Sequence, residues 1–88
     1  MRFKNFGNEF RKIRAKLNLT QAQMGIFIRI HPQYISNCER GLCLLPKKNL
    51  RILVKKFALC PADKELMLLS IAQDQLKATE NEWGKILN

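Results

Sequence analysis

Four apolar residues in the first part of the chain share one face of a helix: Phe6, Phe10, Ile13 and Leu17. Their spacings of four, three and four residues match the helical repeat, and basic residues fill many of the positions between them. Asn18 tolerates the left-handed backbone conformation that often ends a helix. The pattern predicts a helix over about residues 5–17.

A short second helix is predicted over about residues 20–28. Thr20 is a favourable N-cap, and Leu19 and Met24 stand where a hydrophobic staple contact forms. The apolar run at residues 24–28 also has the composition of a strand. We favour the helix because Thr20 starts one only four residues earlier.

Three more helices are predicted after this one. His31 can cap a third helix that Pro32 opens, and Gly41 follows its end. The fourth helix is predicted over about residues 46–59, and its buried stripe contains Leu50, Leu53, Val54 and Phe57. The fifth helix starts at residue 61 and continues to at least residue 78. No strand remains in this interpretation, so the sequence predicts an all-α fold of five helices.

The second and third predicted helices have the spacing of a helix-turn-helix, with about three residues between them. Gly25 is a small residue that allows the two helices to approach closely. Apolar residues are spaced to fill the wedge between the helices: Met24, Ile28, Ile30, Ile35 and Cys38.

Several short motifs surround this unit: Arg14, the triplet Leu19-Thr20-Gln21, Met24-Gly25, Tyr34-Ile35-Ser36 and Glu39-Arg40-Gly41, followed by Pro46, Leu50 and Leu53. Together they resemble the family of lambda-type phage repressors and Cro-like (Xre-type) helix-turn-helix proteins, over about residues 6–60. The resemblance implies a five-helix DNA-binding domain whose third helix, the recognition helix, enters the major groove of double-stranded DNA.

The resemblance also implies which residues face the bases: Gln33, Ser36 and Asn37, with Pro32 and Tyr34 beside them. Glutamine and asparagine can each form two hydrogen bonds with adenine, and serine can bond several base edges. The same residues also suit an ordinary solvated helix face. Tyr34 either contacts DNA or packs on the domain.

Other positions match residues of the family that bind the DNA backbone: Gln21, Arg40, Lys47 and Lys48. Backbone contacts set the register on DNA without reading its sequence. The resemblance also implies an ion pair between Arg14 and Glu39, which would tie the first helix to the third.

Two features depart from the family. Arg29 stands where the turn between the second and third helices usually has Gly. Either the turn differs, or Arg29 is retained for a contact such as a DNA phosphate. Ile26 and Phe27 stand where polar residues are usual, so they are either semi-buried under the N-terminal segment or exposed for a partner.

The charge distribution favours a polyanionic partner. The net charge is +9, and residues 1–60 hold 13 of the 16 Lys and Arg residues but only two acidic residues. Residues 61–88 hold three basic and five acidic residues. The positive charge therefore coincides with the predicted helix-turn-helix domain, as nucleic-acid binding requires. A solvated basic surface without such a partner is the plainer alternative.

We divide the chain into a DNA-binding domain (residues 1–60) and a C-terminal helix with its tail (residues 61–88). The fifth helix carries an apolar stripe of Leu66, Leu69, Ala72 and Leu76. A second apolar set widens it beyond what one domain needs: Met67, Leu68 and Ile71. We expect this set to form a symmetric homodimer suited to a palindromic operator. The alternative is that the helix packs deeper into its own core.

The sequence thus predicts a DNA-binding transcriptional regulator, in finer terms a dimeric repressor of its own operon. The alternative is an antitoxin-like interaction module that binds a small protein partner through Ile26, Phe27 or the fifth helix. An enzyme is not expected, because one His, few acids and no Gly-rich phosphate loop offer no catalytic pocket.

No cofactor or metal is expected either. Cys38, Cys43 and Cys60 lack paired ligand spacing and His31 stands alone, so we expect buried, reduced thiols. No segment has the apolar run of a signal peptide or a membrane helix. We therefore expect a cytoplasmic protein that lies on the nucleoid when bound to DNA.

Overall fold

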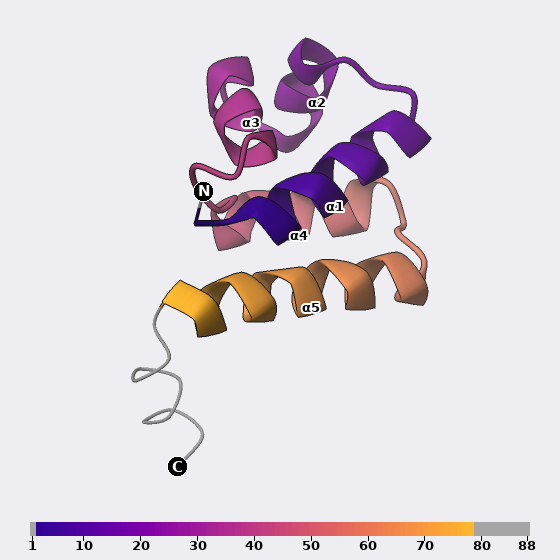
Figure 1. The fold of residues 1–88 in the computed structure, drawn as a ribbon. Coiled ribbons are helices and arrows are strands. Elements are labelled where there is room, and N and C mark those ends of the chain that lie inside the picture. Colours follow the sequence, from indigo (N-terminus) through magenta and orange to yellow (C-terminus); the bar gives the residue numbers. More distant parts are fainter. Residues whose placement is uncertain (1, 79–88) are drawn as a thin grey trace.

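The computed structural model describes residues 2–78, and for residues 76–78 only the helical backbone. Within that range there are five helices and no strand: α1 (Lys4–Lys16), α2 (Gln21–Ile28), α3 (Pro32–Glu39), α4 (Lys47–Lys56) and α5 (Pro61–Ala78). Figure 1 shows α2 and α3 on one side of α1 and α5 on the other. The predicted all-α, five-helix fold is confirmed.

Each of the first four helices is followed by a residue with positive φ: Asn18, Arg29, Gly41 and Ala58. At Gly41 the N–H donates to the carbonyl oxygen of Cys38 at 3.0 Å, and the N–H of Leu42 donates to that of Asn37 at 2.9 Å. These two bonds satisfy carbonyl groups that the end of α3 would otherwise leave free. Ala58 ends α4 in the same left-handed way, so this helix stops at Lys56, before the predicted end near residue 59.

Two helix starts are capped by nearby side chains. Thr20 Oγ1 accepts a hydrogen bond from the N–H of Gln23 at 3.1 Å, and Gln23 Oε1 accepts one from the N–H of Thr20 at 2.9 Å. This reciprocal pair is a capping box. His31 Nδ1 accepts a bond from the N–H of Gln33 at 3.0 Å, with Pro32 at the first position of α3. The predicted N-caps of α2 and α3 are confirmed.

The apolar core draws on all five helices, and its buried side chains are Phe6, Phe10, Ile13, Met24, Ile28, Ile35, Cys38, Leu45, Leu53, Leu59 and Met67. Two glycines bring backbones close together. A Cβ on Gly7 would lie 2.7 Å from two carbonyl oxygens of α3, and one on Gly25 would lie 2.6 Å from the carbonyl oxygen of Ile30. The close approach at Gly25 was predicted, whereas Gly7 had no local signal. Over residues 2–78 no helix combines the length and the apolar character needed to span a membrane.

The start of α1 is capped from α5. Phe3, at the N-cap position of α1, has no capping side chain. Instead, the buried carboxylate of Asp74 accepts hydrogen bonds from the backbone N–H groups of Asn5 (3.2 Å) and Phe6 (2.7 Å). The side-chain amide of Asn5 also donates to Asp74, at 2.9 Å. A negative charge at a helix N-terminus is favourable, so these bonds fix which face of α5 points inward.

The face of α5 that packs on the core differs from the prediction. Met67 is 2 % exposed and belongs to the core, so its predicted place on a dimer surface is wrong. Leu66 and Leu69, from the other predicted stripe, are about half exposed, and Leu68 is 63 % exposed. Ile71 is half-buried against the core. The Leu76 side chain and the tail from residue 79 onward lie outside the described residues.

Ile26 and Phe27 have different surroundings. Ile26 is 77 % exposed. Phe27 is half-buried, and its ring meets that of Phe57 edge-on, with centroids 5.4 Å apart and planes at 84°. Phe27 therefore packs toward the end of α4 and not under the N-terminal segment.

Candidate nucleic-acid interface

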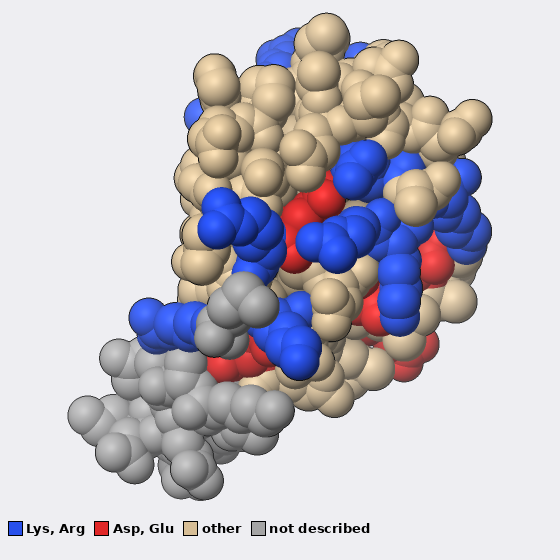
Figure 2. All heavy atoms as spheres, turned by 45° about the horizontal axis from the view of Figure 1, so that its top comes forward, with Lys and Arg blue, Asp and Glu red and all other residues tan. Residues whose placement is uncertain are grey.

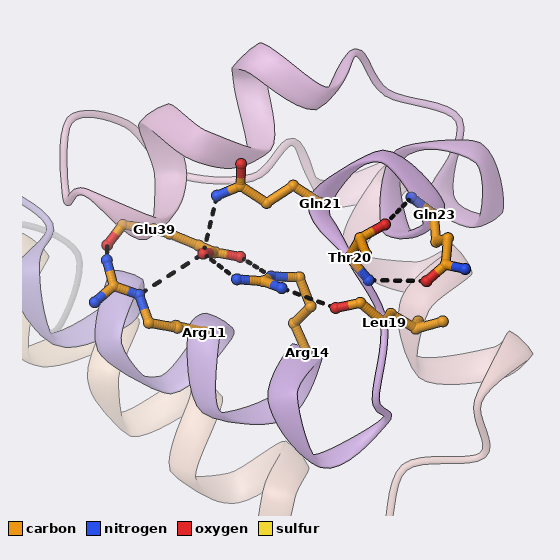
Figure 3. Close-up of polar contacts among 7 residues, drawn as sticks. All are labelled: Arg11, Arg14, Leu19, Thr20, Gln21, Gln23 and Glu39. Carbon is orange, nitrogen blue, oxygen red and sulfur yellow. Dashed lines mark hydrogen bonds and ion pairs between the residues drawn. The ribbon is translucent and has the colours of Figure 1, made fainter.

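A buried carboxylate links α3 to α1. Glu39, the last residue of α3, is 4 % exposed. Its carboxylate accepts hydrogen bonds from Arg14 Nε and, at 2.9 Å, from Arg14 Nη2, so the pair is bidentate (Figure 3). These hydrogen bonds raise the pKa of the Arg14 guanidinium. The structure thus contains the ion pair that the family resemblance implied.

The same carboxylate is reached from α2. Gln21 Nε2 donates to Glu39 Oε1 at 3.2 Å, and Arg11 Nε lies 3.7 Å from that oxygen. Arg14 Nη1 also donates to the carbonyl oxygen of Leu19 at 2.8 Å, just before α2 begins. Figure 3 shows side chains from α1, α2 and α3 converging on one point. The relative position of the three helices therefore depends on one buried charge.

The turn between α2 and α3 is held from α4. Asn49 is buried, and its Nδ2 donates to the carbonyl oxygens of Ile28 (2.7 Å) and Arg29 (3.3 Å) at the end of α2. Arg29 has a φ of 60°, the left-handed conformation that Gly adopts more easily. The turn therefore keeps a backbone conformation suited to Gly while carrying Arg. Sequence analysis missed Asn49, because its partners are 20 and 21 residues away and no local pattern marks it.

The outer side of α3 is polar. Gln33 is exposed, and Ser36 and Asn37 are half-buried on the same side of the helix. Gln33 Nε2 donates to Asn37 Oδ1 at 3.2 Å, across one helical turn. This bond leaves Gln33 Oε1 as an acceptor and the Asn37 amide N–H groups as donors. The structure brings together the three residues that were predicted to face the bases.

Tyr34 and Pro32 have supporting positions. The Tyr34 hydroxyl donates to the carbonyl oxygen of Leu44 at 3.0 Å, and the ring packs against the core. Burial and, to a lesser extent, the neighbouring Cys43 raise the pKa of the Tyr34 phenol. Of the two roles left open by the sequence, packing on the domain is the one seen here. Pro32 is half-buried in the first turn of α3.

Exposed basic residues lie before and after α3 and at the start of α4. The predicted backbone-binding cations Arg29, Arg40, Lys47 and Lys48 are all exposed. No ion pair joins any of them to an acid within the part of the chain that the structure describes. Figure 2, in which the upper helices of Figure 1 are turned toward the viewer, shows Lys and Arg side chains gathered across the middle of the view, with acidic groups recessed among them.

The cysteines are free thiols in three environments. Cys38 is buried, and its Sγ lies 3.6 Å from that of the half-buried Cys43. Burial, followed by the hydrogen bond to Cys43, raises the pKa of the Cys38 thiol. Cys60 is exposed, so the expectation of a buried thiol is wrong for this residue.

The fold of this chain is similar to that of a protein of known structure. The chain is similar to the crystal structure of the clp gene regulator ClgR from Corynebacterium glutamicum, with a TM-score of 0.65 and 18 % sequence identity. The likeness covers 99 % of this chain and 90 % of that one. No family model matches the sequence, and no curated protein matches it either.

Proposed function

We propose that the protein is a sequence-specific DNA-binding transcriptional regulator. The observation that carries this proposal is the outer face of α3, where Gln33, Ser36 and Asn37 lie together on a helix anchored by Glu39. A firmly held helix with polar residues on its outer face is what reading of the major groove requires. The likeness in fold to a protein described as a gene regulator supports the same class of function.

The hydrogen bond between Gln33 and Asn37 suggests how a base is read. The bond uses Gln33 Nε2 and Asn37 Oδ1, and so leaves Gln33 Oε1 as an acceptor and Asn37 Nδ2 as a donor. Adenine presents the complementary pair in the major groove, because its N6 amino group donates and its N7 accepts. We propose that the two amides bind one adenine together and keep their mutual bond. Ser36, on the same face, is placed to bond a neighbouring base.

Arg40, Lys47 and Lys48 are proposed to hold the DNA backbone on either side of the reading face. They are exposed and have no acidic partner among the described residues, which leaves their charges available to phosphates. Gln21 joins them through the amide atoms that its bond to Glu39 leaves free. Each phosphate so neutralised steepens the salt dependence of binding by about 0.9 in the slope of log K against log salt.

We also propose that the regulator acts as a homodimeric repressor on a palindromic operator. Leu68, 63 % exposed, is a large apolar side chain in contact with water, with Ile71 three residues along the same helix. Burial of this surface against a second copy would remove it from water. A two-fold axis would also place two recognition helices about one turn of DNA apart.

Selection from a random duplex DNA pool tests the reading function. At about 150 mM salt we expect an enriched palindrome with half-sites about 10–11 bp apart. Gln33→Ala should weaken binding to that site by about 1–3 kcal/mol and change binding to random DNA little. Gln73→Ala, a matched change on the exposed side of α5, should alter neither. A pool without enrichment would contradict specific reading, and equal losses on both DNAs would leave Gln33 only a positioning role.

A further inference from the structure

A surface groove between α2 and α4 is not used by the proposed reading of DNA. It has a volume of about 380 Å³ and is lined by Phe27, Arg29, Ile52, Lys55 and Lys56. Its lining is therefore two large apolar side chains and three cations, without an acidic residue. The reading residues lie on α3, whereas this groove lies where α2 meets α4.

The apolar part of the groove is firmly held. The Phe27 ring packs edge-on against Phe57, and Lys56 Nζ lies 5.3 Å from the centroid of the Phe27 ring. The ammonium group of Lys56 thus stays at the rim while the aromatic ring forms the wall. Ile26, the residue before Phe27, is 77 % exposed and adds apolar surface on the outer side of α2.

The cations of the groove have no acidic partner in the described part of the chain. No ion pair there joins an acid to Arg29, Lys55 or Lys56. Arg29 is also kept in a left-handed conformation, which is unfavourable for an L-residue with a side chain. Three exposed cations without acidic partners in the described residues, gathered around one groove, favour a negatively charged ligand.

Phosphate alone does not account for this lining. A DNA backbone would satisfy the three cations but would offer no apolar partner to the exposed parts of Phe27 and Ile52. A peptide that carries both carboxylates and large apolar side chains matches both parts of the groove. Charge complementarity and the apolar wall therefore point to the same kind of occupant.

We propose that this groove is the docking site for an acidic, amphipathic segment of a partner protein. The apolar side chains of that segment contact Phe27 and Ile52, and its carboxylates meet Arg29, Lys55 and Lys56. This interaction does not depend on base reading, because the groove lies between α2 and α4 and the reading residues lie on α3. It gives Phe27 and Ile52 a role that base reading does not supply.

Two pairs of adjacent lysines on α4 provide a matched test. Lys55 and Lys56 border the groove, whereas Lys47 and Lys48 open the helix outside it, and all four are exposed. A phage-displayed library of random dodecapeptides is panned against the full chain. We expect enriched peptides to combine Asp or Glu with large apolar residues. A labelled enriched peptide is then titrated by fluorescence anisotropy with each variant.

K55E/K56E should weaken peptide binding on the order of tenfold or more, because reversed charges repel the acidic peptide. K47E/K48E should leave it within about twofold of wild type, since any remaining effect is long-range and screened by salt. R29G gives a second groove variant that suits the backbone at this position and should also weaken binding. Melting curves confirm that each variant is folded.

Three results would overturn the proposal. The first is a library without enrichment of acidic, apolar peptides. The second is an enriched peptide that binds K55E/K56E and K47E/K48E equally well. The third concerns DNA binding. If K55E/K56E lowers the affinity for DNA and the slope of log K against log salt as much as K47E/K48E does, the groove cations bind DNA phosphates instead. The peptide titration does not require DNA. A DNA selection without enrichment would therefore contradict the proposed reading by α3 and leave the proposed peptide site to be tested by itself.

Discussion

Glu39 holds a negative charge at a position that is 4 % exposed. A buried charge is tolerated when it is paired and fully hydrogen-bonded, and here Arg14 and Gln21 donate to both carboxylate oxygens. Loss of the carboxylate would leave the half-buried Arg14 guanidinium without its counter-charge. We therefore expect a change at this residue to affect folding more than the proposed reading of DNA.

Replacement of Glu39 by Gln should lower the free energy of unfolding by about 3 kcal/mol, because breaking a buried pair strands its partner. Glu9→Gln is the control, since Glu9 pairs with an exposed Lys12 at 3.4 Å. That change should cost less than about 1 kcal/mol. Urea denaturation followed by circular dichroism measures both. Similar decreases in the free energy of unfolding for the two variants would show that burial does not make the Glu39 pair more stabilising than an exposed pair.

At Arg29 a substitution is expected to stabilise the fold. Arg29→Gly should raise the free energy of unfolding by about 1 kcal/mol, because Gly adopts a φ of 60° without the clash of a Cβ. Ala15→Gly, at an exposed position inside α1, should lower it by about 1 kcal/mol. Thermal melts of the two variants provide the comparison. A destabilised Arg29→Gly would mean that contacts of the side chain outweigh the backbone strain.

Residues with local partners could be predicted from the sequence. The caps at Thr20 and His31 act within three residues of themselves, and short motifs mark them. The pair between Arg14 and Glu39 spans 25 residues and came from the family resemblance, not from spacing. Asn49 and Asp74 were missed because each serves a helix end far along the chain, and a polar residue in an apolar stripe gives no sign of its partner.

At the scale of elements, α1 and α5 depend on each other. The backbone N–H groups at the start of α1 find their acceptor in Asp74, 68 and 69 residues later. Any helix N-terminus leaves such donors unpaired unless a side chain or water accepts from them. α5 thus contributes a cap as well as apolar contacts, and its removal would expose both.

Asp74→Ala should lower the free energy of unfolding by about 2 kcal/mol, since it removes a helix cap and leaves buried donors unpaired. Asp74→Asn retains one acceptor oxygen and should lose about half as much, because the charge near the helix dipole is absent. Denaturant titration measures the free energy of unfolding of wild type, Asp74→Asn and Asp74→Ala, which should decrease in that order. The proposed cap would be contradicted if Ala and Asn behaved alike and close to wild type.

The orientation of α5 shows why the pattern failed for this element. Apolar residues occupy several sides of the helix, so helical periodicity alone selects no unique inner face. The actual inner face contains Met67, Ser70 and Asp74, two of which are polar. Polar residues are ordinarily placed outside, which is why Leu66 and Leu69 were given the inner face instead. The hydrogen bonds of Asp74 determine which side of α5 faces inward, and these bonds form only in the tertiary structure.

At the scale of the whole molecule, three surfaces lie on different elements. The outer face of α3 is proposed to read bases, the groove between α2 and α4 is proposed to bind an acidic peptide, and Leu68 marks the proposed dimer surface on α5. Such separation allows a regulator to bind DNA, a second copy and a partner at the same time. It also means that each surface can be altered alone.

The dimer is tested by Leu68→Glu, which places a charge on the proposed apolar contact. Wild type should sediment as a dimer at tens of micromolar, and Leu68→Glu as a monomer, because a buried unpaired carboxylate is strongly unfavourable. The matched control is Leu42→Glu, since Leu42 is also a half-exposed leucine but follows α3. The Leu42→Glu variant should remain dimeric.

A monomeric Leu68→Glu variant should also bind a palindromic site more weakly than wild type, because the linkage between two recognition helices is lost. It should bind a single half-site as well as wild type does. A wild-type protein that sediments as a monomer both with and without its selected DNA would contradict the proposed dimer and leave α3 acting on single sites.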